Sequence, residues 1–330
     1  MKTIALFNNQ GGVGKTTLVY HLAHMFPRLG YPTLAVDLDP QANLTSAFFD
    51  EDKLEDLWES NTDTILGCVD PILEGTGDVK VPSPLQVADN LWVIAGDLGL
   101  SRFEDKLSGS WAGGFNEDPA ALRATSAFHR ITVQGANLVG AEVVLFDVGP
   151  NLGAINRAAL LAADFLVIPL AADLFSLQGL KNLGPTVRDW RQKWTRVREI
   201  VSGKTAVELP RGDMTPAGYV VLQHAVRLDR PVKAYAKWLR RIPAVYCEAV
   251  LGEPSLSDNG DDVHCLATLR NFRSLMPMAQ DARKPMFDLK PADGAIGSHA
   301  QLAQTCAADF KNLASRIVQT CELQRVPEYH

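Results

Sequence analysis

A glycine-rich loop between a short strand and a helix constrains this chain more than any other feature. The run Asn8-Asn9-Gln10-Gly11-Gly12-Val13-Gly14-Lys15-Thr16-Thr17 follows an apolar segment and precedes apolar positions at helical spacing. Glycines let the backbone curl so that its amides face a polyphosphate, and the dipole of the following helix favours the same anion. Lys15 would supply charge to the β and γ phosphates, and Thr16 a hydroxyl ligand for Mg²⁺. The loop therefore predicts nucleotide binding.

The rest of the chain alternates between short apolar runs and amphipathic segments. Strands are expected at residues 3–7, 33–36, 91–95, 143–146, 165–169 and 219–222. Helices are expected at about 18–29, 152–163, 176–199, 231–241 and 298–320, with short helices and loops over 48–90. This order predicts an α/β fold with a doubly wound, mostly parallel sheet and helices on both faces. We expect one domain over residues 1–330, with an insertion-like acidic segment at about 48–135.

Charge and cysteine content exclude several classes of protein. The net charge is −6, with 9 basic and 20 acidic residues over 1–150 and 23 basic and 18 acidic residues over 151–330. An acidic total argues against a chain coated in nucleic acid, yet the second half can present a basic face. The five cysteines are widely spaced without a CxxC pair, which indicates reduced thiols. No apolar run reaches the ~18 residues of a spanning helix and no secretory signal is evident, so we expect a cytoplasmic protein.

The loop departs from the common phosphate-binding sequence at Asn9, where a glycine is usual. It instead resembles the deviant Walker A motif of the ParA/MinD family of ATPases, whose usual run is Lys-Gly-Gly-x-Gly-Lys-Thr-Thr. Residues 36–43 (Val-Asp-Leu-Asp-Pro-Gln-Ala-Asn) are similar to the family's switch segment, and residues 145–150 (Leu-Phe-Asp-Val-Gly-Pro) to its Walker B strand. Residues 173–180 follow at the expected distance, and residues 270–273 and 284–288 match the base-side loop and final strand. The resemblance implies a P-loop NTPase fold over essentially the whole chain.

The resemblance also implies roles for matching residues. Lys15 would act on the phosphates, Asp39 would position or activate the attacking water, and Asp147 would hold Mg²⁺ through water. Phosphoryl transfer needs charge neutralisation and an in-line water more than covalent participation, so these roles are chemically sensible. Asp37 would support Mg²⁺ or the switch, although an aspartate at a strand end is equally often a helix cap or turn residue. Arg270 would lie in the base-side loop.

Gln10 occupies the position of the family's signature lysine, which in the family reaches across a nucleotide-sandwich dimer. A neutral hydrogen bond is roughly half as strong as a charge-assisted one. Either another cation substitutes, for which Lys181 is a candidate beside its reading as an ordinary solvated lysine, or ATP-driven dimerisation and hydrolysis are weakened. Gly149 in place of the first Walker B proline and Leu269 in place of a base-side proline are further departures.

Adenine is the expected base, by the absence of a guanine-specific Asn-Lys-x-Asp motif and by resemblance, so the expected cofactors are ATP and Mg²⁺. Two basic clusters are candidate contacts for the phosphates of double-stranded DNA, with a solvated helix face as the alternative. The candidate residues are Arg188, Arg191 and Arg198 on a helix whose Trp190 and Trp194 should pack into the core, and Arg230, Lys233 and Lys237. Membrane attachment is not expected, because residues 322–330 have little amphipathic character.

Two hypotheses from different classes remain open. The first is a ParA-like ATPase that forms an ATP-bound homodimer, binds DNA, is stimulated by an adaptor protein and positions or segregates a cargo. Such a protein would associate with the nucleoid. The second, motivated by Gln10, is a scaffold or regulatory switch with slow or absent hydrolysis. His21 and His24 stand three apart, but no cysteine or acidic pattern completes a metal site, so both are expected to be core or surface histidines.

Overall fold

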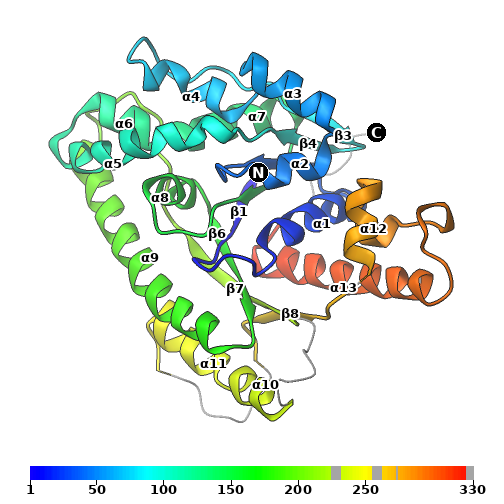
Figure 1. The fold of residues 1–330 in the computed structure, drawn as a ribbon. Helices are drawn as coiled ribbons and strands as arrows, with labels where there is room; N and C mark the ends of the chain where they lie inside the picture. Colours follow the sequence, from blue (N-terminus) through cyan, green and yellow to red (C-terminus); the bar gives the residue numbers. More distant parts are fainter. Residues whose placement is uncertain (224–231, 255–261, 273, 325–330) are drawn as a thin grey trace.

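An eight-stranded sheet organises the chain (Figure 1). The computed structural model describes all residues except 224–231, 255–261, 273 and 325–330. Among the described residues the strand order is β3-β4-β2-β5-β1-β6-β7-β8, and β3 with β4 is the one antiparallel pair. The strands are β1 (Lys2–Leu6), β2 (Thr33–Asp37), β3 (Leu85–Ala88), β4 (Leu91–Ile94), β5 (Val143–Asp147), β6 (Phe165–Ala171), β7 (Thr215–Leu222) and β8 (Cys265–Leu269).

Helices cover both faces of this sheet. The helices are α1 (Lys15–Arg28), α2 (Asn43–Phe48), α3 (Glu51–Ser60), α4 (Ile65–Leu73), α5 (Phe103–Gly113), α6 (Pro119–Thr125), α7 (Ala127–Val139), α8 (Ala154–Leu161), α9 (Leu174–Val201), α10 (Val232–Leu239), α11 (Ile242–Val245), α12 (Leu275–Ala282) and α13 (Ser298–Thr320). Short turns of tighter or wider helix are η1 (Leu98–Arg102), η2 (Gly114–Asn116), η3 (Tyr246–Leu251), η4 (Met286–Asp288) and η5 (Pro291–Asp293). One apolar layer joins α1, α12 and α13 to the sheet, and the other joins α4, α5, α7, α8 and α9 to it (Figure 1).

The central strands bring their carboxyl ends to one edge of the sheet. Every residue of β2 and β5 is buried, because helices pack on both faces. The register pairs Asp147 with Leu6 on one side and with Asp37 on the other. In doubly wound sheets, ligands bind outside the carboxyl ends of the strands, where the strand order reverses. The fold thus selects the ends of β1, β2 and β5 as the place to look for a site.

The sequence predicted this architecture correctly, with two omissions at the edges of the sheet. The strands and helices predicted from the apolar patterning are present, and the predicted α/β class with a mostly parallel sheet is confirmed. The edge strands β3 and β8 were not predicted, because their sequences lack a continuous apolar run and several of their residues are only half-buried. Residues 48–135 contribute β3 and β4 to the sheet and α5 and α7 to the core.

The prediction of a final strand over residues 284–288 was wrong. The chain leaves α12 through Arg283, whose φ of 47° is left-handed, and Pro285 then has no amide to offer a neighbouring strand. Residues 286–288 instead form the 3₁₀ turn η4, in which Asp288 N donates to Pro285 O at 2.8 Å. The turn packs against α13 rather than extending the sheet. A single apolar pair in this segment was too short to distinguish a strand from a buried turn.

The longest helix, α9, is amphipathic along its whole length. Its Trp190 and Trp194 are buried, as predicted, while alternate turns expose charged residues. Trp194 Nε1 donates to Pro210 O at 2.9 Å, which satisfies its one polar atom. In the part of the chain that the structure describes, no helix is both long enough and apolar enough to cross a membrane.

Gly184 allows α9 to approach η3 closely. A Cβ atom on Gly184 would lie 1.9 Å from Ala249 O and 2.9 Å from Val250 Cα, and backbone atoms cannot easily move aside. We expect Gly184→Ala to lower the free energy of unfolding by about 1–3 kcal/mol, measured by urea denaturation. The matched control is Gly109→Ala in α5, where a Cβ would meet no heavy atom within 4 Å. Equal stability of the two variants would contradict this account of the packing.

Candidate functional site

The loop between β1 and α1 adopts a conformation that depends on glycine. Gly12 and Gly14 have φ angles of 73° and 87°, in the left-handed region that other residues rarely enter. A Cβ atom on Gly14 would also lie 3.0 Å from the Leu222 side chain at the end of β7. The loop therefore curls tightly over the N-terminus of α1, where free backbone amides and the helix dipole favour an anion.

Lys15 begins α1 and points along the inside of the loop. Its Nζ donates to Gln10 O at 3.2 Å, and the residue is only 7% exposed. Burial lowers the pKa of the Lys15 ammonium, while the nearby Asp147 and Asp39 carboxylates oppose that shift. Lys15 is thus a buried cation held by one backbone carbonyl, a position from which it can be drawn to a stronger anionic acceptor.

Asp37 ends β2 with both carboxylate oxygens occupied. Oδ1 accepts a hydrogen bond from Asp39 N at 3.2 Å, and Oδ2 accepts from Thr45 N at 2.8 Å and Thr45 Oγ1 at 2.7 Å. Burial raises the pKa of Asp37 to about 6, against the effect of these hydrogen bonds. The predicted alternatives for Asp37 were support of Mg²⁺, support of the switch segment, or an ordinary helix cap or turn residue. These contacts tie the start of α2 to the end of β2, which is what a capping or switch-supporting residue would do.

Asp147 is the contrasting carboxylate. It is fully buried at the end of β5, and neither of its oxygens has a hydrogen-bond partner among the described residues. Burial, together with the charge of Asp37, raises the pKa of Asp147 well above its usual range, while the nearby Thr16 hydroxyl and Lys15 ammonium act against that shift. Unpaired buried carboxylates are costly unless a cation compensates them. These residues fit Mg²⁺, which Asp147 and the Thr16 hydroxyl would hold together with phosphate oxygens and water.

Asp39 lies on the wall of the cavity described next. The residue is 7% exposed, and its Oδ1 accepts a hydrogen bond from Gln41 N at 3.0 Å. Gly149 follows β5 on the other side, and a Cβ atom there would lie 3.3 Å from Asp39 Oδ1. A larger residue at 149 would crowd the carboxylate, which gives a physical reason for glycine at this departure from the family pattern.

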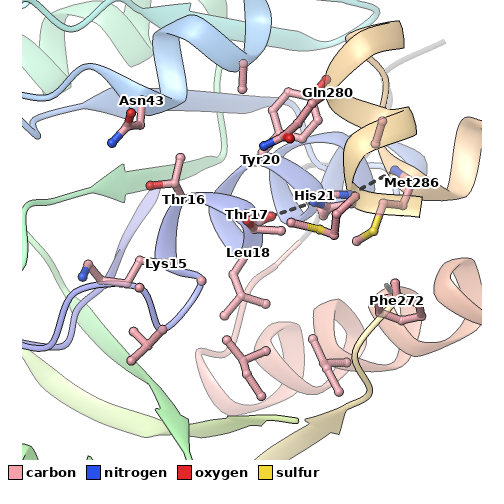
Figure 2. A pocket seen from close by; sticks show the side chains of 18 of the residues that line it. Lys15, Thr16, Thr17, Leu18, Tyr20, His21, Asn43, Phe272, Gln280 and Met286 are labelled. Carbon is pink, nitrogen blue, oxygen red and sulfur yellow. Dashed lines mark hydrogen bonds between the residues drawn. The ribbon is translucent and has the colours of Figure 1, made fainter. Parts of the chain in front are cut away.

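A cavity of about 830 Å³ opens beside the loop. One end is lined by the loop, by Lys15 and Thr16, and by Asp39 from the switch segment. Figure 2 shows Lys15 and Thr16 on one side of this space and Phe272, Gln280 and Met286 on the other. A polar end built for charge and an apolar end with an aromatic side chain together suit a polyphosphate joined to a flat ring.

The apolar end includes residues that sequence reasoning did not assign to the site. Tyr20, Phe272, Gln280 and Met286 line the cavity from α1, from the segment after β8, from α12 and from η4. Helical spacing after the loop could have indicated Tyr20, which follows Thr16 by four residues on α1. Phe272 and Met286 lie in the segments matched to the base-side loop and the final strand, yet neither was assigned to the site, and no local signal identified Gln280.

The predicted base-side residue Arg270 lines the same cavity, just after β8. Its Nε lies 3.4 Å from Asp309 Oδ2 of α13, and its side chain is about half exposed. This ion pair holds the guanidinium at the mouth of the cavity rather than deep within it. Since exposed ion pairs contribute little stability, Arg270 can change partners when a ligand binds.

His21 is a structural residue on the cavity wall. Its Nε2 accepts a hydrogen bond from Met286 N at 3.0 Å, so its Nδ1 is the atom that donates to Thr17 O, 2.7 Å away. Burial lowers the pKa values of both His21 and His24 to about 4. Among the described residues, no cluster of three or more His, Cys, Asp or Glu side chains could hold a metal ion. All five cysteines are free thiols.

The candidate DNA-contacting residues have different surroundings. The Arg188 guanidinium donates to Ala249 O and to Val250 O, and the Arg191 guanidinium donates to Met214 O, so both are partly buried structural contacts. Arg198 is exposed near the end of α9. Lys237 is exposed on α10, as is Lys181 on α9. Arg230 and the side chain of Lys233 lie outside the described parts of the chain.

Comparison of the sequence with known proteins assigns the chain to a family. The family described as "AAA domain" matches residues 1–200, more than half of the chain. The sporulation initiation inhibitor protein Soj of Bacillus subtilis is 30% identical over 187 residues, which cover 57% of this chain and 65% of Soj. The chromosome-partitioning ATPase Soj of Thermus thermophilus is 29% identical over 191 residues, covering 58% and 63%. The chain belongs to this ParA/Soj family of AAA-domain ATPases.

Solved structures support the fold over nearly the full length. A protein from Corynebacterium diphtheriae has a TM-score of 0.73 at 23% identity, covering 97% of this chain and 99% of its own. A variant of McdA from Cyanothece, solved in complex with ATP, has a TM-score of 0.61 at 17% identity, covering 99% of both chains. The alignments to curated relatives are shorter and span about two thirds or less of most of those proteins. At these identities the structures show the shared fold of the ParA/Soj family and nothing more specific.

The raised pKa of Asp147 makes a prediction about stability and pH. The folded chain keeps a proton on this carboxyl that the unfolded chain releases above about pH 4, so this group costs stability as pH rises. Asp147→Asn removes the charge while keeping the shape. We expect the variant to gain stability over wild type as pH is raised from about 5 to about 8, reaching about 1–3 kcal/mol.

The measurement is urea denaturation without nucleotide or Mg²⁺ across this pH range. Asp189→Asn serves as the control, because Asp189 is a half-exposed carboxylate on α9 paired with Lys193. This control should show no comparable pH-dependent gain. A destabilised Asp147→Asn protein at every pH would contradict the assignment of Asp147 as a buried acid whose charged form is disfavoured by burial.

Proposed function

We propose that this protein is a Mg-ATP-dependent ATPase of the ParA type. In the proposed cycle, ATP binding produces a homodimer that binds double-stranded DNA, and hydrolysis stimulated by an adaptor protein resets it. The observation that carries the proposal is a cavity whose polar end is lined by Lys15, Thr16 and Asp39 and whose other end is apolar, with the buried Asp147 carboxylate close behind Lys15. Such a site suits a divalent cation and a polyphosphate, because a bound cation would compensate the buried negative charge that is costly without it.

Each residue would contribute a separate step. The amides of residues 11–17 and the Lys15 ammonium would bind the phosphate oxygens, and the Thr16 hydroxyl and Asp147 would hold Mg²⁺. When bound, Mg²⁺ supplies neutralisation of the charge that develops on the transferring phosphoryl group. Asp39, on the cavity wall, would orient the attacking water. Asp37 would keep Asp39 in place through the hydrogen bond to its amide.

Adenine is the base that we propose for the apolar end. Phe272 and Tyr20 offer aromatic surface, and Gln280 offers a carboxamide, which can both donate to and accept from an adenine edge. The likeness to a protein solved with ATP is consistent with this choice. Arg270, already exposed at the mouth, would be available to the ribose or phosphates after leaving Asp309.

The DNA-binding part of the proposal rests on exposed basic side chains. Arg198 donates to Arg211 O at 3.1 Å, which places two exposed arginines side by side near the end of α9. Lys237 lies on α10, which Figure 1 places well away from the C-terminal end of α9 that carries Arg198. Phosphates attract such cations without reading sequence. Since Arg188 and Arg191 are half-buried as well as bonded to backbone carbonyls, whereas Arg198 is exposed, we do not assign the contact to Arg188 and Arg191.

A second candidate function is an ATP-dependent scaffold or regulatory switch with slow hydrolysis or none. The observation that favours it is Gln10, which brings no positive charge to the phosphates and whose side chain is already bonded within the chain. In this alternative the ATP would order the site without being turned over quickly. The cargo in the first function and the partner in the second would be recognised by other surfaces.

Nucleotide binding and turnover separate the two functions. Lys15→Ala should weaken ATP binding by roughly 10- to 100-fold, because a charge-assisted contact is lost. Asp39→Ala should keep ATP bound but abolish turnover. We would measure ATP binding by calorimetry and phosphate release with and without double-stranded DNA. Unchanged turnover in both variants would overturn the ATPase assignment, and tight ATP binding by a wild type that releases no phosphate would favour the switch.

DNA binding has its own test. Arg198→Glu and Lys237→Glu should each weaken binding to mixed-sequence duplex DNA and reduce the slope of log affinity against log salt by about 1. Fluorescence anisotropy in the presence of ATP would report both quantities. Lys53→Glu makes the same charge change on the acidic helix α3 and should have a smaller effect. Equal losses from all three variants would point to net charge rather than a defined DNA surface.

A further inference from the structure

Gln10 makes three hydrogen bonds, one each through its backbone amide, its backbone carbonyl and its side-chain oxygen. Its amide donates to Asn8 Oδ1 at 3.0 Å, its carbonyl accepts from Lys15 Nζ at 3.2 Å, and its side-chain Oε1 accepts from Ser176 Oγ at 3.1 Å. The first two contacts lie within the loop. The third joins the loop to the first turn of α9, 166 residues later.

Ser176 is fixed on the α9 side of this contact. The residue is fully buried, its amide donates to Asp173 Oδ1 at 2.8 Å, and its Oγ accepts from Ala171 N at 3.0 Å. A serine hydroxyl can donate one hydrogen bond, and Gln10 Oε1 accepts the one from Ser176. Ser176 therefore connects the end of β6, the N-terminal cap of α9 and the phosphate-binding loop.

Neighbouring contacts dock the same half of the loop on the same elements. Asn8 Nδ2 donates to Pro169 O of β6 at 2.7 Å. A Cβ atom on Gly179 of α9 would lie 3.0 Å from Asn9 Oδ1, which is tighter than ordinary contact. Asn8, Asn9 and Gln10 thus rest on β6 and α9, whereas the glycines that follow them have few such supports.

We propose that Gln10 is a positioning residue of the nucleotide site, which fastens the phosphate-binding loop to α9 of the same chain through Ser176. Because the Gln10 carbonyl accepts a hydrogen bond from Lys15, the contact of the Gln10 side chain with Ser176 fixes the position of the Lys15 ammonium before a phosphate binds. The carboxamide oxygen of Gln10 is thus used within its own chain. This inference rests on the proposed binding of ATP at the loop.

A double-mutant cycle tests the contact. Gln10→Met keeps the length of the side chain and removes the acceptor, and Ser176→Ala removes the donor. Each should weaken ATP binding by about 3- to 10-fold, the effect of one neutral hydrogen bond. The double variant should bind ATP no more weakly than the weaker-binding single variant, because both changes remove the same hydrogen bond between Ser176 and Gln10. Calorimetric titration of the full chain with Mg-ATP gives the affinities.

Two controls separate positioning from general loss of structure. Thr186→Ala removes another α9 hydroxyl, which donates to Asn182 O at 2.8 Å, without touching the loop, and should bind ATP as wild type does. Competition by adenosine, which has no phosphates, should be unchanged in Gln10→Met, whereas a disordered site would lose adenosine and ATP alike. Gln10→Asn, which keeps the carboxamide but shortens it, should behave like Gln10→Met.

The outcomes distinguish this inference from the proposed function. Wild-type affinity in Gln10→Met, or independent and additive losses in the cycle, would overturn the Gln10–Ser176 contact as a determinant of the site. Should Ser176→Ala fail to fold because Ala171 N loses its acceptor, Gln10→Met and Gln10→Asn still decide the question. A wild-type protein that binds no ATP would instead overturn the proposed function.

Discussion

Two buried carboxylates at the ends of neighbouring strands set the conditions for the whole site. Asp37 and Asp147 are paired in register, and neither is exposed. Asp37 is stabilised by three hydrogen bonds, whereas Asp147 has none among the described residues. Burial without compensation disfavours the charged form, so the chain on its own holds Asp147 in a state that a cation would relieve. The apolar core that holds β2 and β5 together offsets this local cost.

Around this pair, some side chains are fixed by the core and others have contacts that can be exchanged. The core strands place the acids, and the glycine loop places backbone amides around the N-terminus of α1. Gly149 keeps the space that the Asp39 carboxylate occupies. The contacts that are easiest to exchange are those of Lys15 with a single carbonyl and of Arg270 with an exposed aspartate. A ligand can therefore recruit both cations while the acids and strands stay in place.

The link between Gln10 and Ser176 connects this site to the longest helix of the chain. From its first turn beside the loop, α9 continues past η3, where Arg188 is bonded to two carbonyls, to Val197 beside η2. Its arginines are thus divided between internal contacts and the surface. The helical spacing that groups Arg188 with Arg198 says nothing about this division, because the partners of Arg188 come from a segment about 60 residues away.

The sequence by itself determined the phosphate-binding loop and the order of strands and helices, and it pointed to Lys15, Asp39 and Asp147 through the loop motif and the family resemblance. These features are local, since a strand, a glycine turn and a helix start are each encoded within a few adjacent residues. Tertiary structure alone decided which acid would be left without partners, which arginines would be occupied, and which apolar side chains would close the cavity. Those outcomes depend on packing between segments far apart in sequence, as between Asp37 and Asp147 or Gln10 and Ser176, and no local pattern records such distances.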